Sequence, residues 1–234
     1  MTRPTDPHLL PRLLRHTSYR LKNGAERIDE ILLRRTLRGL GAPTVARVPT
    51  WTTLRELRAL FDLAVNCPDG AKVLEIGSYL GASSCVLASG LAQRRGHLFC
   101  VDTWHNNTIP GGERDTFAEF SRNTEAFRRV ITPIRKRSDQ LCAVDVRVPL
   151  SLVFLDGDHS YDAVSAEVAL VTPWIADGGT LAFHDAVAFE GVARTIGDAL
   201  ASGLWQFSGH VDNLVWLRRV RWSEPGYTPP TAHA

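Results

Sequence analysis

The chain has 234 residues, 44% of them hydrophobic and 22% charged, and its formal net charge is +2. This composition fits one folded α/β domain, and with no apolar leader and no run of about 18 apolar residues it predicts a cytoplasmic protein without a membrane partner. The four cysteines form no C-x-x-C pair and are expected to be reduced, buried thiols rather than disulfides or zinc ligands.

The first predicted element is a helix over residues 23–40, since Asn23 can cap it and glycines at its far end supply stop signals. Residues 1–50 carry ten Arg or Lys against four Asp or Glu, a balance that could attract nucleic acid. The basic side chains of this helix alternate with apolar ones at helical spacing, as on the solvent side of an amphipathic helix. We therefore expect no nucleic-acid partner.

A second helix is predicted to begin at Thr53, which has capping-box spacing to Glu56, and to end before Pro68. Residues 1–68 then form an N-terminal helical extension, expected to act as a lid or as a contact in a homo-oligomer. The loop at 105–112 contains two glycines and a proline and is a second candidate lid. Nothing in either segment names the substrate.

From residue 72 onward, short apolar runs alternate with longer amphipathic stretches, which is typical of βα units around a parallel sheet. The segment 205–219 instead predicts two strands with a short connection, so that the last strand runs antiparallel. The sequence thus predicts an α/β fold with a Rossmann-like, doubly wound, seven-stranded sheet over residues 69–222, and a flexible tail at 223–234. The expected strands are 73–76, 98–102, 130–134, 150–156 and 180–185, and the expected helices are 82–93, 113–128, 139–144, 161–172 and 190–201.

A glycine turn follows the first strand, in the segment that runs from Glu75 to Gly81. Gly77 and Gly81 flank a strand-to-helix turn, which lets the backbone approach a ligand closely. A dinucleotide site requires G-x-G-x-x-G, and Tyr79 stands where the second glycine would be. The spacing therefore disfavours a nucleotide-dependent oxidoreductase.

The form E-x-G-x-x-x-G resembles motif I of class I methyltransferases, which implies S-adenosylmethionine as the methyl donor. The resemblance implies that Glu75 suits the positive charge of that donor. Asp102 ends the second strand, where such folds place a ribose-binding carboxylate; its alternative role is a helix or turn cap. The further expected donor contacts are Gly77, Ser78, Tyr79, Gly81, Thr103, Trp104, Ser138, Asp139 and Asp156.

Two of these contacts have ordinary structural alternatives. Trp104 could line the adenine pocket or simply pack in the core. Ser138 and Asp139 open a short helix where family members often bind the adenine amino group, but an N-cap would use the same residue types. The sequence leaves both choices open.

The segments FLDGDHSY, at 154–161, and GGTLAFHD, at 178–185, place acidic and histidine side chains at the ends of two successive strands. Together they resemble a bacterial small-molecule methyltransferase family that includes macrocin O-methyltransferases and cephalosporin hydroxylase-like proteins. The resemblance runs from about Lys72 to Asp185. Relatives with a metal site use an Asp at the first strand end and an acidic pair at the second, which implies Asp156 with His184 and Asp185 as ligands.

The expected divalent ion is Mg²⁺ or Mn²⁺. Histidine at 184 departs from the relatives' acidic pair, which either weakens the case for Mg²⁺ or shifts the preference towards Mn²⁺ or another transition metal. His159 matches a histidine that takes the hydroxyl proton in relatives, and it is our candidate general base; its alternative is a contact at the start of the next helix. Asp162 and Glu167 are expected on the exposed face of that helix, and Gly178–Gly179 in a turn before the next strand.

The leading interpretation is O-methylation of a hydroxylated small molecule, such as a natural-product or sugar intermediate, with metal assistance. Two alternatives remain open at this point. One is a metal-independent methyltransferase in which His184 and Asp185 only shape the pocket, and the other is an auxiliary protein that binds the donor without turnover. Chelator sensitivity separates the first two interpretations, and donor binding without turnover would mark the third.

Overall fold

A computed structural model describes residues 24, 27–28, 31–36, 38–39, 47–106 and 113–220. The described residues between 24 and 39 are helical, as expected there. The tail predicted at 223–234 and most of the candidate lid at 105–112 lie outside the described residues. Among the residues described, no helix is long and apolar enough to cross a membrane.

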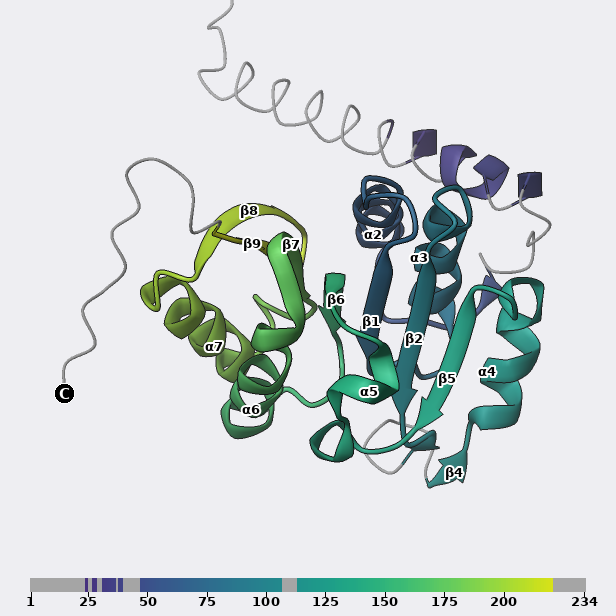
Figure 1. Ribbon diagram of the computed structural model, residues 1–234. Helices are drawn as coiled ribbons and strands as arrows, with labels where there is room; N and C mark the ends of the chain where they lie inside the picture. The colour runs from purple at the N-terminus through teal and green to yellow at the C-terminus, as the bar shows by residue number, and fades with distance from the viewer. Residues whose placement is uncertain are drawn as a thin grey trace, which may run out of the picture.

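The central element is a seven-stranded sheet with the order β5-β2-β1-β6-β7-β9-β8 (Figure 1). Its first five members run parallel, and β9 pairs antiparallel with both β7 and β8. The predicted Rossmann-like sheet with its antiparallel last strand is confirmed. The strands are β1 (Lys72–Ile76), β2 (His97–Asp102), β5 (Ile131–Arg135), β6 (Leu150–Leu155), β7 (Ile175–Phe183), β8 (Trp205–Val211) and β9 (Leu214–Arg219), with a separate ribbon of β3 (His105–Asn106) and β4 (Arg114–Asp115).

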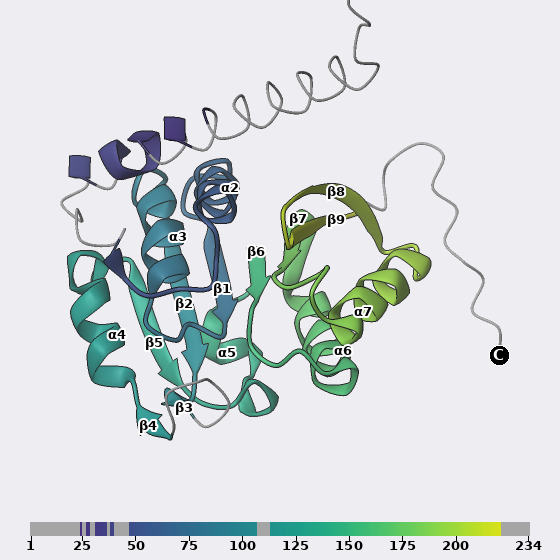
Figure 2. The ribbon, with the colours of Figure 1, turned by 180° about the vertical axis from the view of Figure 1, so that it is seen from behind.

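Helices cover both faces of the sheet, which gives three layers (Figures 1 and 2). On one face lie α2 (Leu54–Val65), α3 (Ala82–Ala92) and α4 (Phe117–Thr124), and on the other lie α5 (Ala143–Val146), α6 (Tyr161–Val171) and α7 (Glu190–Ala201). Single 3₁₀ turns at Glu125–Phe127, Ser138–Gln140 and Thr172–Trp174 join these elements.

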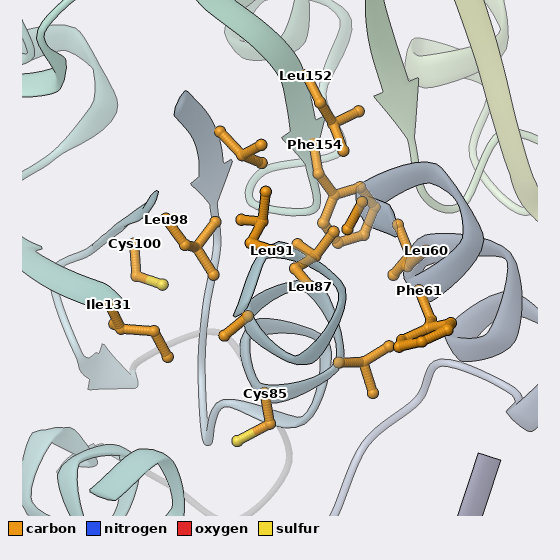
Figure 3. Packing of buried hydrophobic residues seen from close by; sticks show 14 of the residues in the cluster. Leu60, Phe61, Cys85, Leu87, Leu91, Leu98, Cys100, Ile131, Leu152 and Phe154 are labelled. Atoms are coloured by element: carbon orange, nitrogen blue, oxygen red, sulfur yellow. The ribbon is translucent and has the colours of Figure 1, made fainter. Parts of the chain in front are cut away.

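Each central strand is buried on both sides because it separates two hydrophobic cores. Successive residues alternate between them: Val73 and Leu152 belong to the core under α2 and α3, while Leu74 and Val153 belong to the core under α6 and α7. Figure 3 shows the first core, where side chains of β2, β5 and β6 meet those of α2 and α3. This double burial explains why the strands read as continuous apolar runs instead of alternating ones.

Helix α2 is part of the first core and packs directly on α3. Leu60 and Phe61 of α2 lie in the same buried cluster as Leu87 and Leu91 of α3 (Figure 3). The predicted capping box is present: the Thr53 hydroxyl accepts from the Glu56 N–H, and the Glu56 carboxylate accepts from the Thr53 N–H. The role of the whole 1–68 extension as a lid or oligomer contact stays a prediction.

Several local expectations differ from the structure. The helix predicted at 113–128 is interrupted, because residues 114–115 pair with β3 before α4 begins at Phe117. Gly178–Gly179 lies inside β7 and not in a turn before it; the register against β6 shifts there, and Gly178 has a φ of +72° that suits glycine. Cys142 is exposed, whereas the other three thiols are buried as expected.

Candidate functional site

The glycine turn after β1 forms because two strand ends meet there. Gly77 has a φ of +88°, and a Cβ atom at this position would lie 2.1 Å from the carbonyl oxygen of Asp156, at the end of β6. Any side chain would therefore push the two strand ends apart. Gly81 also has a positive φ, of +89°, and stands as the N-cap of α3. The turn thus brings a bare backbone to the carboxyl edge of the sheet, where α/β folds bind ligands.

Asp102, at the end of β2, ties this turn in place. One of its carboxylate oxygens accepts hydrogen bonds from the backbone N–H groups of Ser78 (3.0 Å) and Tyr79 (2.8 Å), and the other accepts from the Trp104 N–H (2.7 Å). The cap role that the sequence left open is therefore real. Since two carboxylate oxygens offer about four acceptor sites, capacity remains for a further donor from the adjoining cavity.

Two cavities open at this edge of the sheet and share a wall. The smaller one, of about 300 Å³, lies over the ends of β1, β2 and β5, and the larger one, of about 730 Å³, lies between the glycine turn, the segment 49–52 in front of α2 and the ends of β6 and β7. The smaller cavity is lined by Asp102, Thr103, Trp104, Ser138, Ala163 and Glu167, among others. The larger is lined by Trp51, Ser78, Gly81, His159, His184, Asp185 and Phe189, among others, and both are bordered by Gly77, Tyr79, Asp156, Gly157 and Asp158.

Two expected donor contacts, Glu75 and Asp139, border neither cavity, and a third, Trp104, has two roles. Glu75 is fully buried, accepts hydrogen bonds from the hydroxyls of Ser78 and Ser84, and borders neither cavity. Asp139 points to solvent in an exposed ion pair with Arg137. Trp104 does both things proposed for it, because it lines the smaller cavity while its ring packs at 4.7 Å from that of Phe120.

The candidate metal ligands converge as the strand ends predicted. Asp156, His184 and Asp185 each offer one atom within 4.8 Å of the others. The Nδ1 atom of His184 lies 3.1 Å from a carboxylate oxygen of Asp156 and 3.4 Å from one of Asp185. Ligands at right angles around an ion with bonds of about 2.1 Å stand about 3 Å apart, so these residues fit a divalent cation.

A proton on the Nδ1 atom of His184 would occupy the same position as a metal ion. Burial opposes the charge of His184, but the carboxylates of Asp156, Asp185 and Glu56 outweigh it and raise the pKa of this imidazole to about 12. The pKa of Asp185 is lowered in turn, mainly by His159 and to a smaller extent by His184. A metal ion would have to displace the Nδ1 proton, so metal binding should release protons.

Glu56 stands behind His184 and was not singled out as a site residue from the sequence. It is 1% exposed, lies 3.2 Å from His184 Nε2, and accepts a hydrogen bond from the Asn213 N–H at 2.7 Å. Burial acts against its charge, but the hydrogen bonds from His184 and from the backbone lower its pKa below the usual value. Glu56 thereby fixes an N–H on Nε2 and aims Nδ1 at the cluster. The capping-box spacing of Glu56 predicts its hydrogen bonds with Thr53 at the start of α2, but it does not predict the contact with His184.

His159 lies beside this cluster, at the start of α6. Its Nε2 atom is 3.1 Å from a carboxylate oxygen of Asp185, an ion-pair distance without hydrogen-bond alignment, and its ring stacks on Phe189 with centroids 4.3 Å apart. Asp185 is the main reason that the pKa of His159 is raised. The arrangement gives an imidazole that stacks on Phe189, lies beside Asp185 and borders the larger cavity.

Solved structures of methyltransferases share this Rossmann-like fold. A putative caffeoyl-CoA O-methyltransferase from Staphylococcus aureus superposes with a TM-score of 0.56 and 17% identity over 80% of this chain and 92% of that one. The TDP-rhamnose 3′-O-methyltransferase CalS11 of calicheamicin biosynthesis gives 0.55 and 14%, over 81% and 94%. An O-methyltransferase from Bacillus cereus in complex with SAH gives 0.54 and 15%, over 81% and 90%.

A sequence match agrees with the fold. Residues 74–186, from within β1 to just past the cluster of His184 and Asp185, match a family model described as a methyltransferase domain. The segment spans the glycine turn, Asp102 and both candidate metal-binding strand ends. The matched segment is therefore a methyltransferase domain, on a fold that the O-methyltransferase neighbours share, and this supports a methyltransferase dependent on S-adenosylmethionine.

Proposed function

We propose that this protein transfers the methyl group of S-adenosylmethionine to a hydroxyl oxygen of a small molecule. The observation that carries the proposal is the shared wall of the two cavities. The donor's nucleoside would occupy the smaller cavity, beside Asp102 and Ser138, with its sulfonium at Gly77 and Tyr79. The acceptor would occupy the larger cavity, where His159 and the Asp156–His184–Asp185 cluster face the same point.

The chemistry is an in-line displacement. His159 takes the proton of the acceptor hydroxyl as the oxygen forms its bond to the methyl carbon; the carbon–sulfur bond breaks, and S-adenosylhomocysteine leaves. Asp185 orients the imidazole and stabilises its charged form. A divalent cation held by Asp156, His184 and Asp185 would position acceptor oxygens and lower the pKa of the reacting hydroxyl.

The acceptor is proposed to be small because the larger cavity has a volume of about 730 Å³ and aromatic side chains in its lining. Trp51 and Phe189 line it and are both exposed, and the Trp51 ring packs 5.2 Å from that of Tyr79. Such rings bind the flat face of a phenol or of a sugar better than they bind a phosphate backbone. A natural-product or sugar intermediate suits this lining, in agreement with the resemblance to macrocin O-methyltransferases.

A metal-independent reaction is the second candidate, and one observation favours it. The proton on His184, held between Glu56 and Asp156, already places a positive charge where a cation would lie. In this form the imidazolium would orient Asp156 and Asp185, and His159 would work alone on the acceptor.

The test begins with calorimetric titration of S-adenosylhomocysteine into the protein, with Mg²⁺, with Mn²⁺ and with EDTA, followed by a turnover screen of phenols and sugar derivatives. We expect micromolar donor binding under all three conditions and turnover that EDTA abolishes. Turnover that persists in EDTA would establish the metal-independent reaction. Absence of donor binding in every condition would refute the proposed function.

The contact between Glu56 and His184 gives a separate prediction about metal affinity. Loss of a carboxylate that orients a metal-binding histidine typically weakens metal binding about 10–100-fold. We therefore expect Glu56→Gln to raise the dissociation constant for Mn²⁺ by about this factor, measured by electron paramagnetic resonance of the free ion. The matched control is Asp62→Asn on the exposed face of the same helix, which should leave Mn²⁺ affinity unchanged. Equal affinity in the Glu56 variant and the wild type would contradict the orienting role.

A further inference from the structure

Glu167 is a buried acid at the inner wall of the smaller cavity, although the sequence placed it on an exposed helix face. It shares the buried side of α6 with Val164 and Val171, and it is 5% exposed. Its Oε1 atom lies 3.7 Å from where a Cβ of Gly157 would be, and Gly157 borders both cavities. A side chain at Gly157 would stand in contact with this carboxyl group.

One oxygen of this carboxyl group lacks a partner. Among the described residues, Oε2 of Glu167 is buried and accepts no hydrogen bond, and the Ser138 hydroxyl lies near enough to the group to lower its pKa. Buried polar atoms are nearly always paired, and Glu167 borders the smaller cavity, so a ligand there can supply the missing partner once the carboxyl group turns toward it. Ser138 borders the same cavity, and Asp102 lines its other part.

The charge state of Glu167 suits a ligand that both donates and accepts. Burial is the main reason that its pKa is raised to about 7, and Asp158 adds to the shift. Ser138 and His159 act in the opposite direction. Near neutral pH, much of the group is therefore a neutral carboxylic acid, which carries an O–H donor and a carbonyl acceptor side by side.

We propose that Glu167 reads the base of the methyl donor, with its carboxyl group bonded to the amino group and an adjacent ring nitrogen of adenine. This inference rests on the proposed function, because it takes the smaller cavity as the nucleoside site. A side chain with a donor and an acceptor side by side matches adenine in this way, as glutamine does when it binds the same base in nucleic acids. The cavity volume of about 300 Å³ is sufficient for a nucleoside.

The test compares wild type, Glu167→Gln and Glu167→Leu in calorimetric binding of S-adenosylhomocysteine and of S-inosylhomocysteine, in which an oxygen replaces the amino group. Glutamine keeps one donor and one acceptor, so we expect its dissociation constant for S-adenosylhomocysteine to stay within about threefold of the wild type at pH 6. Leucine should weaken that binding by about 10–100-fold, on the scale of one to two lost hydrogen bonds of a buried group. It should also bring the dissociation constants of the two ligands close together. Asp162→Asn, on the first turn of the same helix, is the matched control.

A second measurement keeps the proposal testable if the leucine variant does not fold. Wild-type affinity for S-adenosylhomocysteine should fall between pH 6 and pH 8, since the ionised carboxylate cannot donate to a ring nitrogen, and Glu167→Gln should have a flatter profile. Asp158 and His159, which also act on Glu167, are present in both proteins. Identical pH profiles, or a folded leucine variant with wild-type affinity, would overturn the role of Glu167 alone. Absence of any binding to the wild type would overturn the proposed function and this inference with it.

Discussion

Replacement of His159 by alanine is expected to lower kcat by about 10²–10⁴-fold, the usual contribution of a general base, and to leave donor affinity within about threefold. His159 borders the larger cavity only, whereas the donor's nucleoside is proposed to occupy the smaller one. Loss of the imidazole therefore removes the proton acceptor and leaves the donor site intact. Steady-state turnover and calorimetric titration of S-adenosylhomocysteine measure the two quantities separately.

The pH profile supplies a second readout for the same residue. Only neutral imidazole can take a proton, and the contact with Asp185 raises the pKa of His159 above its ordinary value. Activity should therefore rise with pH through that raised pKa and reach a plateau above it. His210→Ala, at a position on β8 that borders neither cavity, should keep both the rate and the profile. An alanine variant at 159 with a normal rate would exclude the histidine as the base.

The second large effect is expected for Asp102→Ala, which should weaken binding of S-adenosylhomocysteine by at least about 100-fold. The carboxylate is the proposed acceptor for the ribose hydroxyls, and a hydrogen bond to a charged group contributes about 1.5–3 kcal/mol. The same substitution leaves the N–H groups of Ser78, Tyr79 and Trp104 without their acceptor, so the glycine turn should lose its fixed shape. Both effects act against the donor.

Asp102→Asn separates the two contributions. Its single amide oxygen can still accept from the Ser78 and Tyr79 N–H groups, but the NH₂ group cannot accept from Trp104 or from a ribose hydroxyl. We expect intermediate donor affinity and a smaller loss of thermal stability than in the alanine variant. Asp69→Asn, at an exposed ion pair with Arg95, is the control for a lost surface charge. Unchanged affinity in a folded Asp102→Ala protein would remove Asp102 from the donor site.

The sheet and the convergence of strand ends could be predicted from the sequence because both depend on local patterns. Apolar runs at helical or strand spacing fix the order of elements, and parallel strands carry their last residues to one edge of the sheet. Asp156 and Asp185 therefore come together as expected, although 29 positions separate them in the sequence. The irregularities were not predictable in this way: the register shift at Gly178 depends on pairing with β6, which no pattern in β7 reveals.

Contacts across long sequence distances explain the remaining differences. Glu56 and His184 are 128 positions apart, and nothing near Glu56 indicates a partner beyond its own helix. For Glu167 a signal was present, since Val164 and Val171 place it on the apolar stripe of α6 at positions i, i+3 and i+7. Its charge was taken as a sign of exposure, although a buried acid can be retained where a neighbouring cavity offers a partner.

The hydrogen bond that His184 donates to Glu56 also limits how freely the methyltransferase core, residues 69–222, can be exchanged between proteins. A chimera that kept residues 69–222 and took its leading helix from another chain would retain every residue of the matched segment. It would nevertheless lose the carboxylate that fixes the tautomer of His184 and the acceptor for the Asn213 N–H in the turn between β8 and β9. The helix in front of the first strand would therefore have to be transplanted together with the core.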